Sequence, residues 1–236
     1  TLLHKKLCKS KAFIWVQDLW PESVFSASKL RNTFILKLLS VMVRHIYRRV
    51  NGIMVQSKFF SSSINKLGNF STKISYVPNW AEDVFLDTDS VDNSKYVHVI
   101  PSDSFNIIFA GNIGEAQDIG NVLRAAAITM SNDAIKWFII GDGRKKKEMQ
   151  DLSAKMKLKN VFFLGRYPLN EMPNFFIHAS VALVSLKDEE IFGLTIPSKI
   201  QSYMAFGIPI LTMLNGIGSQ VVNDANCGFV AKAEDY

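Results

Sequence analysis

VALVSLKDEEIFGLTIPSKIQSYMAFGIPILT, residues 181–212, is the stretch that decides the fold. Its apolar ends, 181–184 and 209–212, are typical of two buried strands. Between them lie an acidic loop with a glycine, a proline at 197 able to open a helix, and a helix that ends at Gly207. A loop that leads into a helix N-terminus is a common place to hold a charged, phosphate-bearing ligand. In a parallel sheet that loop lies at the carboxyl edge, where α/β proteins bind their ligands.

The alternation of strands and helices extends over residues 95–236. Apolar runs rich in β-branched and aromatic residues predict strands at 105–110, 135–140, 161–164, 181–186, 209–214 and 228–230. The segments between them predict helices at 120–130, 144–156, 170–179, 198–206 and 218–225. Such alternation favours right-handed βαβ units around a parallel sheet. We therefore predict a Rossmann-like α/β domain over residues 95–236.

Residues 1–85 carry a shorter version of the same pattern. Strands are expected at 13–17, 52–55 and 73–77, and a helix at 33–50. Two or three strands are too few for a whole doubly wound domain, so we expect the later part of a Rossmann-like domain that is truncated at its N-terminus. The polar segment 86–94 is expected to be a linker or surface loop.

Charge also separates the two parts. Residues 1–85 hold 13 Lys and Arg against 4 Asp and Glu, whereas residues 86–236 hold 14 against 17. No stretch reaches the roughly 18 uninterrupted apolar residues needed to span a bilayer. The two cysteines, Cys8 and Cys227, match no metal spacing and are expected to be free thiols in a reducing compartment.

Three further loops follow expected strands and could bind a ligand: 110–118, 140–144 and 165–168. The first has Gly111 and Gly114 at a strand-to-helix junction, where backbone N–H groups can converge on an anion. It matches neither the dinucleotide pattern nor a P-loop. Taken one at a time, each loop is equally typical of a tight turn, and the lysines at 145–147 are typical of a solvated helix face.

Taken in order, the motifs are more specific. They are AGNIG at 110–114, IGDG at 140–143, VFFLGR at 161–166, EIFG at 190–193 and YMAFGIP at 203–209. This series resembles the C-terminal domain of group 1 (family 4) retaining glycosyltransferases. QDLWPES at 17–23 and YVPNW at 76–80 resemble N-domain motifs of the branch that builds bacterial O-antigen and capsule sugars, especially its fucosaminyltransferase-like members. The resemblance implies a GT-B fold, in which two Rossmann-like domains enclose a nucleotide sugar.

The resemblance also implies where the donor diphosphate would bind. Gly111 and Gly114 would approach the diphosphate through their backbone. The family usually has Arg and Lys in this loop, but Asn112 and Gln117 occupy the matching positions here. Lys199, at the start of the expected helix at 198–206, would then have to supply the positive charge, because a cation holds a phosphate better than an amide does.

Other positions are assigned in the same way. Gly165 and Arg166 would border the nucleobase, and the backbone N–H groups of Phe192, Gly193 and Leu194 would face the donor sugar.

The family's paired glutamates match this chain only in part. The first would be Glu190, with Glu189 as the fallback, and it would hold the donor sugar or stabilise the developing oxocarbenium charge. The second normally grips the nucleotide ribose, but Ser202 stands at its place. The upstream Gly-rich loop, the family's histidine and the C-terminal domain-crossing helix are expected to be missing, so we expect the chain to be a fragment that does not turn over alone.

The resemblance predicts transfer of a hexose or aminosugar from a nucleotide diphosphate sugar to a lipid-linked or saccharide acceptor. No metal cofactor is expected, since no Asp-x-Asp motif precedes a sugar site. Two alternatives stay open: a non-catalytic GT-B-like partner or pseudoenzyme, and a GT-B sugar epimerase. The expected location is the cytoplasm, peripherally at the inner membrane face, where the 33–50 helix would place Lys37, Arg44, Arg48 and Arg49 on anionic lipids. A solvated basic edge is the alternative, and no motif indicates nucleic-acid binding.

Overall fold

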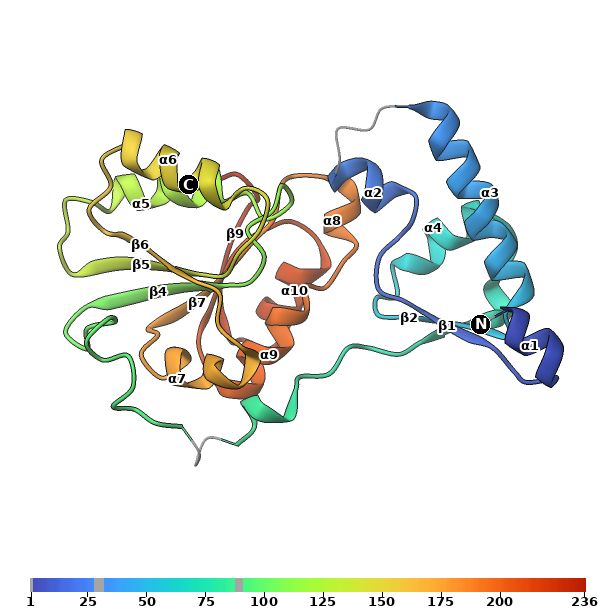
Figure 1. The fold of residues 1–236 in the computed structure, drawn as a ribbon, viewed down its shortest axis with the longest axis horizontal. Helices are drawn as coiled ribbons and strands as arrows, with labels where there is room; N and C mark the ends of the chain where they lie inside the picture. The colour runs from blue at the N-terminus through green and yellow to red at the C-terminus, as the bar shows by residue number, and fades with distance from the viewer. Residues whose placement is uncertain (1, 28–31, 88–90) are drawn as a thin grey trace. The chain divides into compact units, whose positions relative to one another are not determined.

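The computed structural model describes residues 2–27, 32–87 and 91–236, and the chain divides into two compact units (Figure 1). The first unit is Thr1–Asn79 with Glu189–Ile196, and the second is Trp80–Asp188 with Pro197–Tyr236. Residues 80–85, expected with the first part, thus lie in the second unit, and Glu189–Ile196 lies in the first. Residues 88–90 of the expected linker lie outside the described residues.

The second unit is built on a parallel sheet with the strand order β6-β5-β4-β7-β8-β9. Its strands are β4 (Phe105–Ala110), β5 (Ile135–Ile140), β6 (Val161–Gly165), β7 (Val181–Ser185), β8 (Ile210–Met213) and β9 (Gly228–Ala231). All six predicted strands are therefore confirmed, with bounds that differ by one residue at most at either end. The central strand β7 is buried along its whole length, as expected for a strand covered on both faces.

Helices cover both faces of this sheet, with α5 and α6 on one side and α7 and α9 on the other (Figure 1). The helices are α5 (Ile119–Ile128), α6 (Lys146–Lys155), α7 (Met172–Phe176), α9 (Ser198–Phe206) and α10 (Ile217–Asp224). The predicted helix at 170–179 is shorter than expected: residues 169–171 form a 3-10 turn, and α7 begins at Met172 with Pro173 in its first turn, where the missing N–H costs least. Phe109, Leu123 and Trp137 pack in the core between the sheet and α5.

The first unit has a smaller parallel sheet of three strands in the order β1-β2-β3. They are β1 (Phe13–Val16), β2 (Gly52–Val55) and β3 (Ile74–Tyr76). The helices are α1 (Leu2–Cys8), α2 (Glu22–Ala27), α3 (Thr33–Arg49), α4 (Phe60–Lys66) and α8 (Glu190–Gly193). The three strands and α3 agree with the prediction, whereas α1, α2, α4 and α8 were not predicted.

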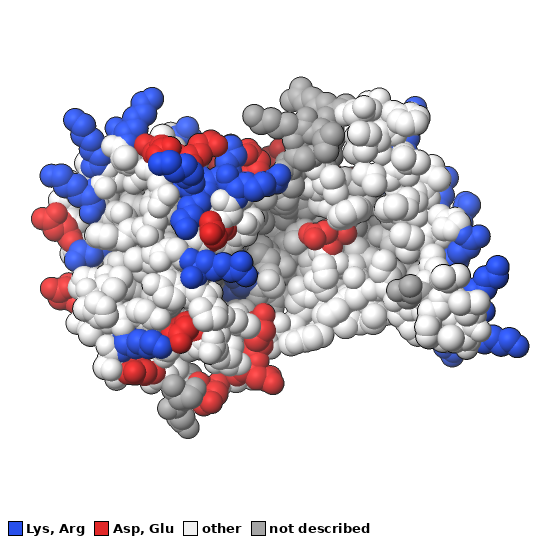
Figure 2. Space-filling view, in the orientation of Figure 1, with Lys and Arg blue, Asp and Glu red and all other residues white. Residues whose placement is uncertain are grey.

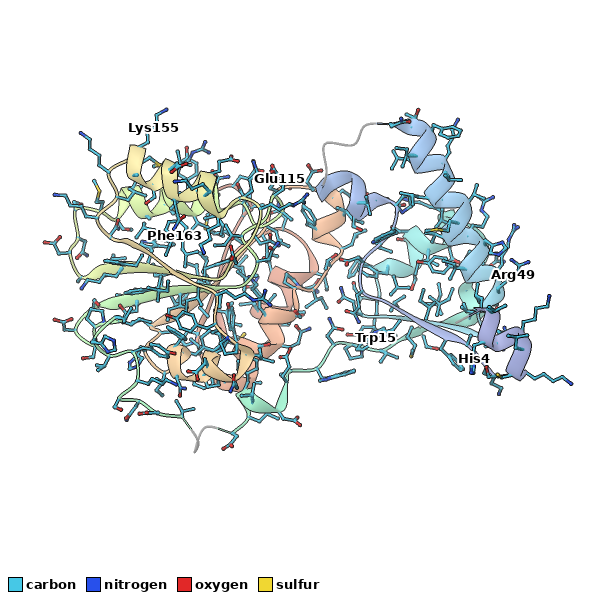
Figure 3. The ribbon with its side chains drawn as sticks, viewed as in Figure 1. His4, Trp15, Arg49, Glu115, Lys155 and Phe163 are labelled. Carbon is cyan, nitrogen blue, oxygen red and sulfur yellow. The ribbon has the colours of Figure 1, made fainter. Side chains whose placement is uncertain are left out.

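Helix α3 packs on this sheet through Val43 and Tyr47, which are buried with Ile53 in the core of the first unit. Its opposite face is exposed, and Figure 2 shows Lys and Arg side chains along the α1 and α3 edge of the unit. Figure 3 labels Arg49 at the end of α3. The backbone carbonyl of Arg49 accepts a hydrogen bond from Nζ of Lys5 in α1. Within the described residues, no helix combines the length and apolar character that a bilayer-spanning segment needs.

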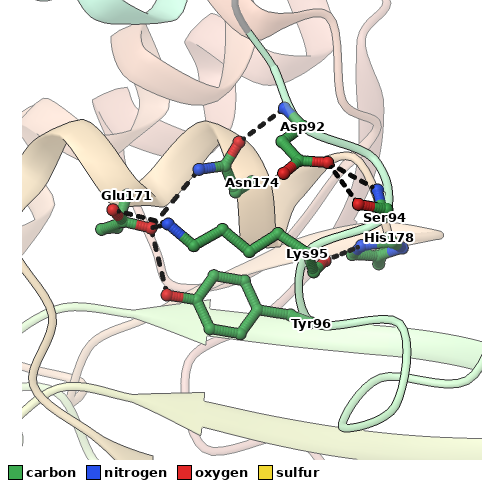
Figure 4. A network of polar contacts seen from close by, with 7 residues as sticks. All are labelled: Asp92, Ser94, Lys95, Tyr96, Glu171, Asn174 and His178. Carbon is green, nitrogen blue, oxygen red and sulfur yellow. Dashed lines mark hydrogen bonds and ion pairs between the residues drawn. The ribbon is translucent and has the colours of Figure 1, made fainter.

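Residues 91–96, at the end of the expected linker, are fixed on the second unit by a polar network (Figure 4). The backbone N–H of Asp92 donates to the side chain of Asn174 at 2.9 Å. Lys95 pairs with Glu171 at 2.7 Å, and the hydroxyl of Tyr96 donates to the same carboxylate at 3.0 Å. The segment is therefore docked on α7 and the 3-10 turn before it.

Candidate functional site: the carboxyl edge of the second sheet

The order of strands in the second unit defines one preferred place for a ligand. From β4 the chain proceeds outward through β5 to β6, then returns to the other side of β4 with β7 and proceeds outward through β8 to β9. The connections from the neighbouring strands β4 and β7 thus leave in opposite directions. Parallel α/β sheets bind ligands at such a switch point, beyond the carboxyl ends of the strands.

The loop after β4 is held against the loop after β5 by direct backbone contact. Gly141 has a φ of +146°, and a Cβ there would overlap the carbonyl oxygen of Gly111. The N–H of Ile113 donates to the carbonyl of Asp142 at 2.8 Å, and the N–H of Lys145 donates to the carbonyl of Ile113 at 3.0 Å. Only glycine allows two backbone segments to approach this closely in that conformation. The contact and the two hydrogen bonds hold the two loops against each other.

Lys199 is the most unusual side chain at this edge. It lies in the first turn of α9, and its Nζ is buried without a hydrogen-bond partner among the described residues. The Nζ lies 3.9 Å from the centroid of the Phe109 ring and would be 2.9 Å from a Cβ on Gly111. Burial lowers the pKa of Lys199 to about 7. A buried ammonium without a counterion is costly, so this donor is poised for an anion beside Gly111.

Asn112 and Gln117 lie at the same loop, but their amides bond within it. The amide nitrogen of Asn112 donates to Oε1 of Gln117 at 3.2 Å, and the N–H of Gly114 donates to the same oxygen at 3.1 Å. The carbonyl of Gln117 accepts a hydrogen bond from the hydroxyl of Ser185, at the end of β7, at 2.7 Å. These two residues therefore shape the loop and tie it to β7.

Ion pairs on Glu115 join the ends of three strands, a feature that we did not predict. Glu115, after β4, pairs with Lys187, after β7, and its second oxygen lies 3.1 Å from Nζ of Lys145, after β5 (Figure 3 labels Glu115). Hydrogen bonds from both lysines lower the pKa of the Glu115 carboxyl. Lys145, expected on a solvated face, is thus part of this edge. Its partner is 30 residues away in the chain, so no local pattern indicates the pair.

Gly165 lies at the same edge, at the end of β6. Its φ is +85°, and its carbonyl accepts a hydrogen bond from the N–H of Gly141 at 2.7 Å. Arg166, which follows it, is exposed.

Ser202, expected where the family has its second glutamate, is buried on α9. Its hydroxyl donates to Oε2 of Glu82 at 3.0 Å. A carboxylate thus does reach this position, although from a segment 120 residues earlier. Sequence reasoning missed Glu82 because nothing in its neighbourhood indicates a contact with α9.

The expected sugar-facing residues belong to the first unit. Ile191 is buried in the core of that unit, and Phe192 and Leu194 pack against it. In this structure the N–H groups of Phe192 and Gly193 donate to the carbonyl of Glu189, at 2.9 and 3.3 Å, and so form the single turn of α8. Their expected contact with a donor sugar stays a prediction, as do the roles of Glu189 and Glu190.

The second unit therefore brings together most of the expected diphosphate and nucleobase residues at the carboxyl edge of one sheet. These residues are Gly111, Asn112, Gly114, Gln117, Gly165 and Lys199.

Comparison with known proteins gives a consistent assignment. The family model described as glycosyl transferases group 1 matches residues 90–236. A curated relative, the probable glycosyltransferase WbjE of Pseudomonas aeruginosa, is 27% identical over 235 residues, which are 95% of this chain and 57% of WbjE. Another, the putative colanic acid biosynthesis glycosyl transferase WcaI of Escherichia coli K12, is 23% identical over 212 residues, covering 87% of this chain and 51% of WcaI. The chain thus spans about half the length of these relatives.

Solved structures show the same fold. Anabaena HepE, crystallised in complex with UDP and glucose, superposes with a TM-score of 0.75 over 99% of this chain and 61% of HepE, at 13% identity. The α/β architecture with parallel sheets is that of the GT-B glycosyltransferases. With a family model that covers residues 90–236, the chain is a member of the group 1 glycosyl transferases.

Proposed function

We propose that the second unit holds the diphosphate of a nucleotide sugar, and that the protein transfers this sugar, with retention of configuration, to a lipid-linked or saccharide acceptor in bacterial surface polysaccharide synthesis. The observation that carries the proposal is the buried Nζ of Lys199 beside Gly111, which has no hydrogen-bond partner in the part of the chain that the structure describes. It places a buried basic nitrogen at the switch point of the sheet, where a nucleotide is expected. The UDP complexes of HepE support a nucleotide at this fold.

Each part of the nucleotide sugar is assigned to residues whose chemistry suits it. Lys199 and the backbone of Gly111 and Gly114 would bind the diphosphate and stabilise its charge as it leaves. Gly165 and Arg166 would border the base. Glu190, with Glu189 as the fallback, would hold the donor sugar or stabilise the oxocarbenium charge. We propose that no metal is needed, because Lys199, charged once the diphosphate is bound, supplies positive charge to the leaving group.

The donor sugar is proposed to be an N-acetylated aminosugar or deoxyaminosugar, from the resemblance to fucosaminyltransferase-like members. The relation to WcaI, named for colanic acid biosynthesis, supports a role in surface polysaccharides.

The first test is thermal stabilisation by nucleotides. UDP at about 100 times its Kd should stabilise the second unit by about 2.7 kcal/mol, which raises its Tm by several degrees. UDP-N-acetylhexosamines should do the same, and EDTA should not abolish the effect. Uridine, which lacks the diphosphate, is the control and should give little shift. No shift with UDP, GDP or their sugars would favour the non-catalytic partner over the transferase.

We also propose that α3 docks on an anionic membrane at the cytoplasmic face. Phe34, Leu38 and Val41 are spaced by helical turns on its outer face and are 73%, 61% and 63% exposed. The C-terminal half of the helix carries Arg44 and Arg48, which line a hollow of about 410 Å³. Lys66 and Ser71 line the same hollow, which suits a phosphate headgroup, while the apolar residues suit the acyl boundary.

Vesicle binding tests this surface. The chain should sediment with vesicles that contain phosphatidylglycerol, but not with pure phosphatidylcholine, and high salt should release it. Replacing Arg44 and Arg48 by Gln should weaken binding about tenfold or more, because each basic residue near the surface contributes about 1 kcal/mol. Val41→Glu should weaken it as well. The matched control is Ile128→Glu on α5, also 63% exposed, which should have no effect. Equal binding of wild type and variants would exclude this face.

A further inference from the structure

The surroundings of Lys199, at the carboxyl edge of the second unit, disfavour the charged form of its amine. Its Nζ faces the Phe109 ring and the backbone of Gly111. It also stands in the first turn of α9, where the partial positive charge of the helix end opposes an ammonium. Tyr203, one turn further along α9, does not balance it, because burial raises the pKa of its phenol, which is bonded to the backbone of Ala110.

The carboxylates of the surrounding elements are held by other groups. In order along the chain these pairs are Glu82 with Ser202, Glu115 with Lys145 and Lys187, Asp118 with Asn121, Asp142 with Lys146, and Asp188 with Asn215. None of them contributes to the pKa of Lys199, which burial alone lowers to about 7. Removing water without supplying a counterion favours the neutral amine.

We propose that Lys199 is a proton-coupled anion receptor: its amine, buried against the Phe109 ring, takes up one proton as the diphosphate binds. The inference rests on the proposed function and adds its regulation by pH. A diphosphate beside Nζ favours the ammonium, so the affinity of the Lys199 amine for a proton rises when the anion is bound. By the same linkage, the diphosphate binds less tightly as the pH rises above the point where the empty site loses its proton.

Because burial lowers the pKa of the empty-site amine to about 7, binding of UDP at pH 8 should take up most of one proton. The Kd should also rise about tenfold between pH 8 and pH 9. UDP itself does not contribute at these pH values, because a terminal phosphate loses its second proton at about pH 6.

Calorimetry in two buffers of different ionisation enthalpy, Tris and HEPES at pH 8, measures the uptake. Lys199→Arg keeps a cation that does not titrate, so its uptake should fall to nearly zero and its Kd should not change between pH 8 and pH 9. Lys155→Arg, an exposed site on α6, should behave as wild type. UDP binding to wild type without proton uptake would overturn this inference and leave the proposed function intact. Absence of UDP binding even at pH 7 would overturn both.

Discussion

Lys199→Met should abolish most of the affinity for UDP while leaving the protein at least as stable as wild type. A charged hydrogen bond to the diphosphate is worth about 1.5–3 kcal/mol, so the Kd at pH 7 should rise about 10- to 150-fold. Methionine has a similar length and no polar atom to desolvate, so it removes the buried, unpartnered amine. The Tm without ligand should therefore stay the same or rise.

This opposite response of binding and stability separates a functional lysine from a structural one. Replacing a lysine that stabilises the fold would lower the Tm. Replacing a lysine that serves to bind a ligand lowers only the affinity for that ligand. Lys155→Met, at an exposed position of α6, is the control for loss of one positive charge and should leave both quantities near wild type. Unchanged UDP affinity in Lys199→Met would contradict the assignment of the anion site.

Gly141→Ala should have the largest effect on stability among single substitutions at this edge. The added Cβ would overlap the carbonyl of Gly111, and the φ of +146° is strained for any side chain. The two loops would have to separate, which breaks the bonds between Ile113, Asp142 and Lys145. We expect a loss of about 3–5 kcal/mol in the free energy of unfolding, together with loss of UDP binding.

Gly207→Ala is the matched control for this prediction. Gly207 also has a positive φ, +83°, but a Cβ there would meet nothing within 4 Å. Its cost should be limited to backbone strain, about 1–2 kcal/mol. Urea denaturation of the two variants, followed by circular dichroism, measures the difference. If both lose the same stability, the close approach of the two loops is not what requires glycine at 141.

The fold was predictable because its signals are local. Strands such as Val181–Ser185 are nearly continuous apolar runs. Gly111 and Gly141 mark the turns after β4 and β5. Helix α3 was predictable from its length and apolar content. The short helices α1, α2 and α4 were missed, because six or seven residues carry too little periodicity.

The site was predictable only where one segment carried the information. The loop Gly111–Gly114 and Lys199 each follow a strand or begin a helix, so their meeting at one sheet edge follows from topology. The contact of Glu82 with Ser202 does not, because it joins segments 120 residues apart. The position of Ile191 does not follow from topology either. In the sequence it lies between strands of the second unit, but it packs in the core of the first unit.

The most direct test of the central claim is a crystal structure of this chain with UDP bound. The account predicts the diphosphate at the carboxyl edge of the second sheet, with a phosphate oxygen about 3 Å from Nζ of Lys199 and others near the N–H groups of the Gly111–Gly114 loop. A diphosphate bound elsewhere on the chain, with Nζ of Lys199 still against the Phe109 ring and without a partner, would contradict it.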